Sequence, residues 1–222
     1  MHDCLKKINF IESKIGEIIN NNQLRNIPQI IAVSKTFSIN NITPLLEKGH
    51  IHFGENKIQE AEIKWDNLKI KYPNFQLHMI GNLQSNKAKK AVKLFDYIHS
   101  LDSNKLALKI SQCEKELNKK VKIFIQVNIA NESQKSGILL ENLNDFYNYC
   151  CLDLSLDIVG LMCLPPINED PIKYFEILMK KSKDLKLSDL SIGMSGDYKK
   201  AILYGSSFLR LGTAIFGQRE IK

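Results

Sequence analysis

Eight short apolar runs rich in β-branched residues are spread along this 222-residue chain, and longer amphipathic stretches separate them. This alternation predicts repeated strand–helix units, and eight such units are the number that closes a parallel barrel. The expected strands cover residues 30–34, 51–54, 76–80, 97–101, 121–129, 158–164, 190–194 and 208–212. The expected helices cover residues 42–48, 58–71, 86–95, 105–118, 139–151, 171–183 and 197–204. We therefore expect an α/β fold, a single (β/α)8 TIM barrel.

The N-terminal stretch MHDCLKKINFIESKIGEII predicts an amphipathic helix that precedes the barrel. It lacks the continuous apolar segment of a signal peptide, and no run in the chain approaches the ~20 apolar residues that cross a bilayer. No linker or break in composition divides the remainder. We expect one domain over residues 1–222, with residues 1–28 as a helical prefix, located in the cytoplasm and without a membrane partner.

An open doubly wound sheet is the alternative to the barrel. That fold normally carries a G-x-G-x-x-G turn after its first strand, and this chain has none there. Polar residues instead follow many different strands, and in a closed barrel those positions converge on a single mouth. The barrel is the better interpretation.

The net charge of +7 raises the question of nucleic-acid binding. Lysines such as Lys87, Lys89 and Lys90 fall on expected solvent faces, without an arginine cluster or an aromatic stacking pattern. Nucleic acid is therefore not an expected partner.

The cysteines and histidines do not predict a metal site. The five cysteines are odd in number and have no C-x-x-C spacing, which argues against a disulfide framework and against zinc. His52, His78 and His99 lie in separate strands without a pattern of carboxylate partners, so we interpret them as core or rim residues.

Lys35 ends the first expected strand, directly after Ser34. A lysine amine in a partly buried mouth with other cations nearby has a lowered pKa and can attack an aldehyde. The chain has 31 lysines and arginines, so on its own Lys35 is better interpreted as a charged residue that ends a strand. The functional interpretation depends on what faces it.

Two glycine-rich turns follow the last two expected strands, at residues 193–197 and 212–217. Ser195 can offer a hydroxyl and a backbone N–H, and the second turn is expected to present the N–H groups of Gly212 and Thr213. Phosphate sites after strands seven and eight recur in barrels. With Lys35, these turns predict a phosphorylated aldehyde held at both ends, and pyridoxal phosphate is the commonest ligand of that description.

Three further polar residues are candidates at the same mouth. Arg210 lies two residues before Gly212 and needs a buried acceptor, which the pyridine nitrogen of the cofactor would supply. Asn56 either forms a hydrogen bond with a ligand oxygen or caps a helix N-terminus, and the two interpretations are equally supported. Lys135 is expected on an exposed loop, with a secondary role in aldehyde transfer left open.

Seven blocks of the chain resemble the pyridoxal-phosphate homeostasis protein family in order and spacing, from about residue 30 onward. The blocks are AVSK, HFGENKIQE, HMIGNLQSNK, SQKSG, GLMCLP, LSIGMSGD and LRLGTAIFG. That family looks like the barrel half of fold-type III enzymes such as alanine racemase, standing alone. The chain departs from the family pattern at Lys57, where tyrosine is common, and at Asn82, where proline is common.

The resemblance implies a role for each candidate. Lys35 would form the Schiff base and Arg210 would face the pyridine nitrogen. The residues implied to hold the phosphate are Met194, Ser195, Gly212 and Thr213. The implied function is to carry and buffer pyridoxal 5'-phosphate in vitamin B6 and amino/keto-acid homeostasis, with no catalytic residues. Apo-enzymes that receive the cofactor are the protein partners this function suggests.

The sequence is also compatible with two enzymatic alternatives. A weak amino-acid racemase needs a second acid/base, which in similar racemases comes from an added C-terminal β-domain. Because the sequence ends at Lys222, soon after the last motif, we expect that domain to be missing and the protein to be a non-enzymatic monomer. A Schiff-base aldolase would use Lys35 on a sugar phosphate and would need an acid/base that we cannot identify.

Overall fold

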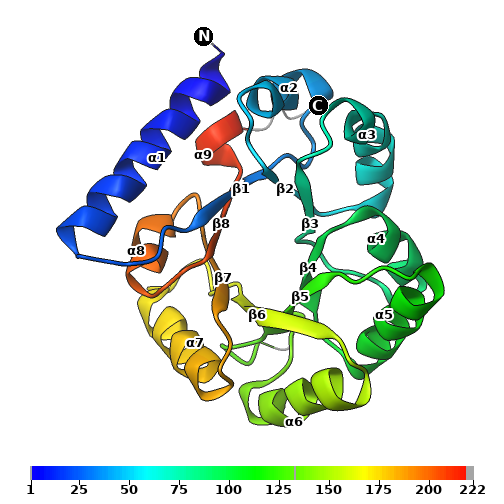
Figure 1. The fold of residues 1–222 in the computed structure, drawn as a ribbon. Coiled ribbons are helices and arrows are strands. Elements are labelled where there is room, and N and C mark those ends of the chain that lie inside the picture. Colours follow the sequence, from blue (N-terminus) through cyan, green and yellow to red (C-terminus); the bar gives the residue numbers. More distant parts are fainter. Residues whose placement is uncertain (1, 133, 219–222) are drawn as a thin grey trace.

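The computed structural model describes residues 2–132 and 134–218, and it is a closed barrel of eight parallel strands in sequence order (Figure 1). The strands are β1 (Gln29–Val33), β2 (His52–Glu55), β3 (Gln76–Met79), β4 (Tyr97–Leu101), β5 (Lys122–Val127), β6 (Asp157–Cys163), β7 (Asp189–Met194) and β8 (Phe208–Leu211). Pairing of Ile31 in β1 with Arg210 in β8 closes the ring. The expected TIM barrel is confirmed.

Helices follow the strands and form the outer ring of the barrel (Figure 1). They are α2 (Ile39–Glu47), α3 (Ile58–Lys71), α4 (Ala88–Leu94), α5 (Asn104–Leu117), α6 (Leu143–Asn148), α7 (Ile172–Asp184), α8 (Tyr198–Leu203) and α9 (Thr213–Phe216). Across the described residues, no helix combines the length and the apolar character that crossing a bilayer requires.

The expected N-terminal helix is α1 (Asp3–Asn21). Its buried residues Ile8, Ile11, Ile15 and Ile19 recur every three or four positions, so they form one apolar stripe. Figure 1 shows α1 outside the barrel beside α8 and α9, and it contacts α2, α8 and α9. This helix covers the side of the barrel where the last strand meets the first.

Apolar side chains form two separate cores. The larger core lies between the strands and the helices, and the smaller core fills the barrel itself. The buried residues of the inner core are Ile31, Val33, Tyr97, Phe124, Met162 and Phe208. Ala32, between two of them, belongs to the outer core, as the alternation of side chains along a strand requires.

The largest differences from the expected elements lie in two segments. Residues 139–151 are not one helix: a 3-10 turn at Leu140–Asn142 precedes α6, and a π-helical turn at Tyr149–Asp153 follows it. The expected strand 121–129 is shorter, because β5 ends at Val127 and Asn128 folds its side-chain amide onto the following loop. Neither difference changes the order of strands around the barrel.

Candidate functional site

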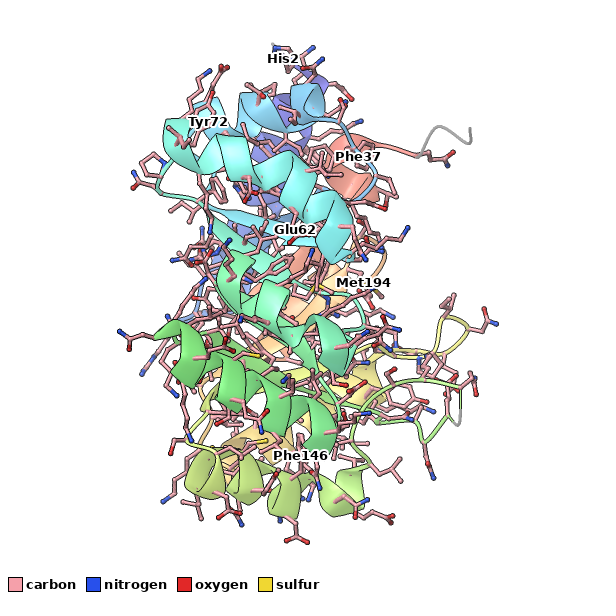
Figure 2. All side chains as sticks on the ribbon, turned by 90° about the vertical axis from the view of Figure 1, so that its right-hand side faces the viewer. His2, Phe37, Glu62, Tyr72, Phe146 and Met194 are labelled. Atoms are coloured by element: carbon pink, nitrogen blue, oxygen red, sulfur yellow. The ribbon has the colours of Figure 1, made fainter. Side chains whose placement is uncertain are left out.

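The carboxyl ends of the strands form one end of the molecule. Figure 2 shows Phe37, which follows β1, and Met194, which ends β7, at the same end, with Tyr72 of the α3 terminus at the other. Every candidate residue from the sequence lies in the last positions of a strand, in the loop after it or, for Thr213, at the first position of the helix that follows. The fold therefore gathers these residues around one mouth, as in other parallel barrels.

Lys35 is half-buried in the turn after β1. Ile31 and Val33 point into the barrel, so the alternation of the strand continues toward the mouth at position 35. The turn is tight, with Thr36 at a φ of 68° and the Phe37 N–H donating to the Ser34 carbonyl. The Phe37 ring stacks on Phe216 with centroids 4.9 Å apart, which packs the lysine turn against α9.

A buried polar network lies directly behind Lys35, and its only signal in the sequence is a charged residue in the HFGENKIQE block. Glu55 is fully buried, and its Oε1 accepts hydrogen bonds from the Ser34 hydroxyl at 2.8 Å and from Lys64 at 2.8 Å. Lys64 also donates to the Ser34 carbonyl at 2.8 Å, and the Trp65 indole donates to Glu55 at 3.1 Å. The network fixes the backbone from which Lys35 projects.

The turns after β7 and β8 are joined to each other. Gly212 precedes α9, and its carbonyl accepts from Ile215 and Phe216, so Thr213 opens a short helical turn. The Ala214 N–H donates to the Ser195 hydroxyl at 3.2 Å. Amide groups at the start of a helical turn have no partner within the helix, which is the property that an anion uses. The structure thus brings Ser195, Gly212 and Thr213 together.

Met194 differs from its neighbours in the turn. Its backbone N–H already donates to the Asp197 carboxylate at 2.5 Å. The same turn depends on Gly193, whose φ of 91° lies in the left-handed region. The Met194 amide is therefore committed within the protein, and Asp197 is a structural residue of the turn that sequence reasoning did not single out.

Arg210 lies inside the barrel and is 5% exposed. Its Nη1 donates to the carbonyl and hydroxyl oxygens of Ser191, both at 2.5 Å, and its Nη2 donates to the Cys163 carbonyl at 2.9 Å. Burial lowers the pKa of Arg210 to about 10, which leaves it a cation at neutral pH. Within the described residues these bonds use three of its five N–H groups, and the other two have no hydrogen-bond partner there.

Asn56 follows β2 at the mouth. Its side-chain oxygen is buried and has no hydrogen-bond partner in the described part of the chain. Gly81, after β3, packs so closely that a Cβ there would lie 2.3 Å from the Asn56 carbonyl oxygen. The loop is held in place while the amide oxygen stays unsatisfied, which favours a ligand contact over a purely structural role.

Lys135 lies at the rim, on the loop after β5. It is half-buried, forms an ion pair with Glu132 at 2.6 Å and donates to the Leu164 carbonyl at 3.4 Å. It also lines a cavity of about 290 Å³ with Asn82 and Gln126. Lys135 is thus less exposed than the sequence suggested, because the loop folds back against the barrel mouth.

Comparison with known proteins identifies similar chains. Residues 18–220 match the family model described as "Alanine racemase, N-terminal domain". A pyridoxal phosphate homeostasis protein from Synechocystis sp. is 37% identical over 200 residues, which cover 86% of this chain and 91% of that protein. A protein of the same name from Vibrio cholerae is 35% identical over 206 residues, covering 88% and 87% of the two chains.

Solved structures give the same picture of the fold. PipY of Synechococcus elongatus with bound PLP superposes with a TM-score of 0.81 at 32% identity, covering 91% of this chain and 100% of PipY. Alanine racemase from Clostridium difficile superposes with a TM-score of 0.73 at 14% identity, covering 99% of this chain and 57% of the racemase. At that identity the racemase likeness concerns the fold alone.

Proposed function

This chain belongs to the pyridoxal phosphate homeostasis protein family, and we propose that it binds pyridoxal phosphate at the carboxyl end of its barrel and buffers it there. The observation that carries the proposal is the buried Arg210, which keeps two N–H donors for a ligand at the end of the barrel where the lysine turn and the two glycine turns lie. The relative PipY holds PLP in a barrel of the same fold.

The residues at the mouth fit this cofactor in chemistry. Pyridoxal phosphate supplies an aldehyde for a reversible covalent link with an amine, together with a phosphate and a ring nitrogen. Lys35 would provide the amine. The Ser195 hydroxyl, whose oxygen accepts from Ala214, still has its proton to donate to a phosphate, and Gly212 and Thr213 would add backbone N–H groups.

Arg210 would donate to the ring nitrogen. An arginine at that position keeps the nitrogen unprotonated, so the ring withdraws electrons weakly. A weak electron sink favours holding and releasing the cofactor over carbanion chemistry. Asn56 would satisfy its unpartnered oxygen by accepting from a ligand hydroxyl or a bound water.

The proposed role is therefore a non-catalytic carrier within the cell, which releases the cofactor to apo-enzymes when another amine displaces Lys35. The racemase fold makes a weak amino-acid racemase the second candidate. Incubation of the loaded protein with L-alanine distinguishes the two. Formation of D-alanine at ordinary enzymatic rates, about 1–10³ s⁻¹, would overturn the carrier role.

The binding proposal is tested by the visible absorption of the protein with pyridoxal phosphate, before and after borohydride reduction. We expect wild type to absorb in the visible range and mass spectrometry to locate the reduced adduct on Lys35, whereas Lys35→Ala forms no adduct and stays folded. Lys57→Ala is the matched control, because Lys57 is exposed and pairs with Glu60 at 3.0 Å. An adduct that persists in Lys35→Ala would refute the assignment.

A further inference from the structure

A chain of hydrogen bonds runs through the barrel to Arg210. Nδ1 of His52 lies 3.0 Å from Nε2 of His78, and Nδ1 of His78 lies 2.9 Å from Nε2 of His99. Nδ1 of His99 lies 2.8 Å from the hydroxyl of Ser191, which also accepts from Arg210 at 2.5 Å. This hydrogen-bond chain joins side chains from five strands: it starts at His52, the first residue of β2, passes through β3, β4 and β7, and ends at Arg210 on the interior face of β8.

Arg210 sets the direction of this chain. A guanidinium can only donate, so the Ser191 oxygen accepts from it. If the Ser191 hydroxyl donates to Nδ1 of His99, each neutral imidazole accepts at Nδ1 and donates from Nε2 to the next one. In the opposite direction the Ser191 proton would have no acceptor among the described residues, and a buried unsatisfied donor costs free energy.

The imidazoles carry one proton each at neutral pH. Burial, together with neighbouring cationic or imidazole groups, lowers the pKa of His78 and of His99 well below the usual value. Burial also lowers the pKa of His52 to about 4. The three rings do not form a metal site: nowhere in the described chain do three His, Cys, Asp or Glu side chains gather around a common point.

We propose that Ser191, His99, His78 and His52 are positioning residues for Arg210, joined in a one-way hydrogen-bond chain in which all three imidazoles are Nε2–H tautomers. The chain presents an oxygen lone pair to Arg210 and so holds the guanidinium with its two remaining donors available. Its far end is His52, which lines a cavity of about 500 Å³ at the amino-terminal end of the barrel. The effect of this arrangement on cofactor binding rests on the proposed function, but the hydrogen-bond chain is present in the ligand-free protein.

Ring packing holds the chain in register. The His78 ring stacks on Tyr97 with centroids 4.3 Å apart, and His99 stacks on Phe124, also at 4.3 Å. Both histidines are fully buried. A flipped ring would place carbon atoms where Nδ1 and Nε2 lie and would break both of its hydrogen bonds, so the packing and the hydrogen bonds specify the same orientation.

The tautomers are measurable in the ligand-free protein by long-range ¹H–¹⁵N correlation spectra at pH 7. We expect His52, His78 and His99 to be Nε2–H tautomers, and a dominant Nδ1–H form of His78 or His99 would overturn the proposal.

In Arg210→Met the fixed donor is lost, and we expect an Nδ1–H population at His99. His50 is an internal control, because it donates from Nε2 to the His52 carbonyl at 2.9 Å whichever way the chain runs. Unchanged tautomers in Arg210→Met would show that the arginine does not set the direction.

A second experiment measures the effect on the cofactor. We expect Ser191→Ala to weaken the binding of pyridoxal phosphate, and of pyridoxal without phosphate, by roughly tenfold. This is the lower end of the effect of losing a hydrogen bond to a charged group. Ser191→Thr keeps the hydroxyl and is expected to restore the affinity. Ser206→Ala is the matched control, because the Ser206 hydroxyl is also buried but bonds to the Ile192 carbonyl at 2.7 Å. Unchanged binding in Ser191→Ala, or an equal loss in Ser206→Ala, would remove the positioning role. Wild type that forms no adduct at Lys35 would refute the proposed function and leave the tautomer result intact.

Discussion

The backbone N–H of Ala214 donates to the hydroxyl of Ser195 over 3.2 Å, and this bond joins the loop after β7 to the first turn of α9. The same short helix receives the stacking contact of Phe37 through Phe216. The lysine turn and both glycine turns are therefore attached to α9, although they come from opposite ends of the sequence. A displacement of α9 would therefore disturb the turn of Lys35 and the turns of Ser195 and Gly212 together.

Ser195→Ala tests the proposed phosphate site. The substitution removes a donor to phosphate and the acceptor for Ala214, so we expect binding of pyridoxal phosphate to weaken by roughly 10-fold, the effect of about 1–1.5 kcal/mol. Binding of pyridoxal, which has no phosphate, is expected to change little, and titration of the visible absorption measures both. Equal losses for the two ligands would show that Ser195 does not contact phosphate.

Gly193→Ala tests the backbone of the same turn. Gly193 has a φ of 91°, and a Cβ there would lie 2.6 Å from the Cβ of Ala201. We expect the free energy of unfolding to fall by at least about 1–3 kcal/mol, measured by urea denaturation, because strain and overlap add. Gly196→Ala is the matched control: a Cβ there would meet nothing within 4 Å, and its cost should stay below about 1 kcal/mol. Similar losses in the two variants would contradict this account.

The strands and their order could be predicted because the buried strands of a parallel barrel are rich in apolar residues, and short apolar runs mark most of them in this sequence. Residues 139–151 were harder: their helical spacing is intact, but the π-helical turn at Tyr149–Asp153 depends on how that segment packs under β6. Local pattern does not contain that information.

In the candidate site, too, the sequence predicts where residues lie along the strands but not how their side chains pack. The placement of Lys35, Ser195, Gly212 and Thr213 at the mouth could be predicted, because each comes directly after a strand. The pairing of Glu55 with Lys64, and of Met194 with Asp197, depends on side-chain direction within loops and helices. His52, His78 and His99 were correctly interpreted as core or rim residues, but spacing could not reveal that their rings touch across neighbouring strands.

Lys64→Met tests the network behind Lys35. Removal of the ammonium leaves the fully buried Glu55 without its cation, while its Oε2 already has no partner in the described chain. We expect a loss of about 3–5 kcal/mol in the free energy of unfolding, measured in urea. Lys57→Met removes an exposed ion pair instead and should cost at most about 1 kcal/mol. If Lys64→Met lost no more than Lys57→Met, the buried pair would not stabilise the turn.

The buried histidine chain predicts lower stability in acid. The pKa of His52 is lowered to about 4 in the folded protein, and those of His78 and His99 are lowered well below 6.5. Between pH 6.5 and 4 the unfolded chain therefore binds protons that the folded protein does not. This contribution to stability is complete above pH 6.5 and is lost as the pH falls toward 4.

Carboxylates and His50 also titrate in that range, so a variant is needed to separate the contribution of the hydrogen-bonded histidines from theirs. His99→Phe keeps a ring that can stack on Phe124 but removes one proton acceptor from the unfolded state. We expect the free energy of unfolding of this variant, measured in urea at pH 7, 6 and 5, to fall less steeply than that of wild type. The difference in slope should be about 1 kcal/mol per pH unit, close to one proton. Parallel slopes would mean that His99 takes up its proton equally well in the folded barrel, which is incompatible with a neutral chain.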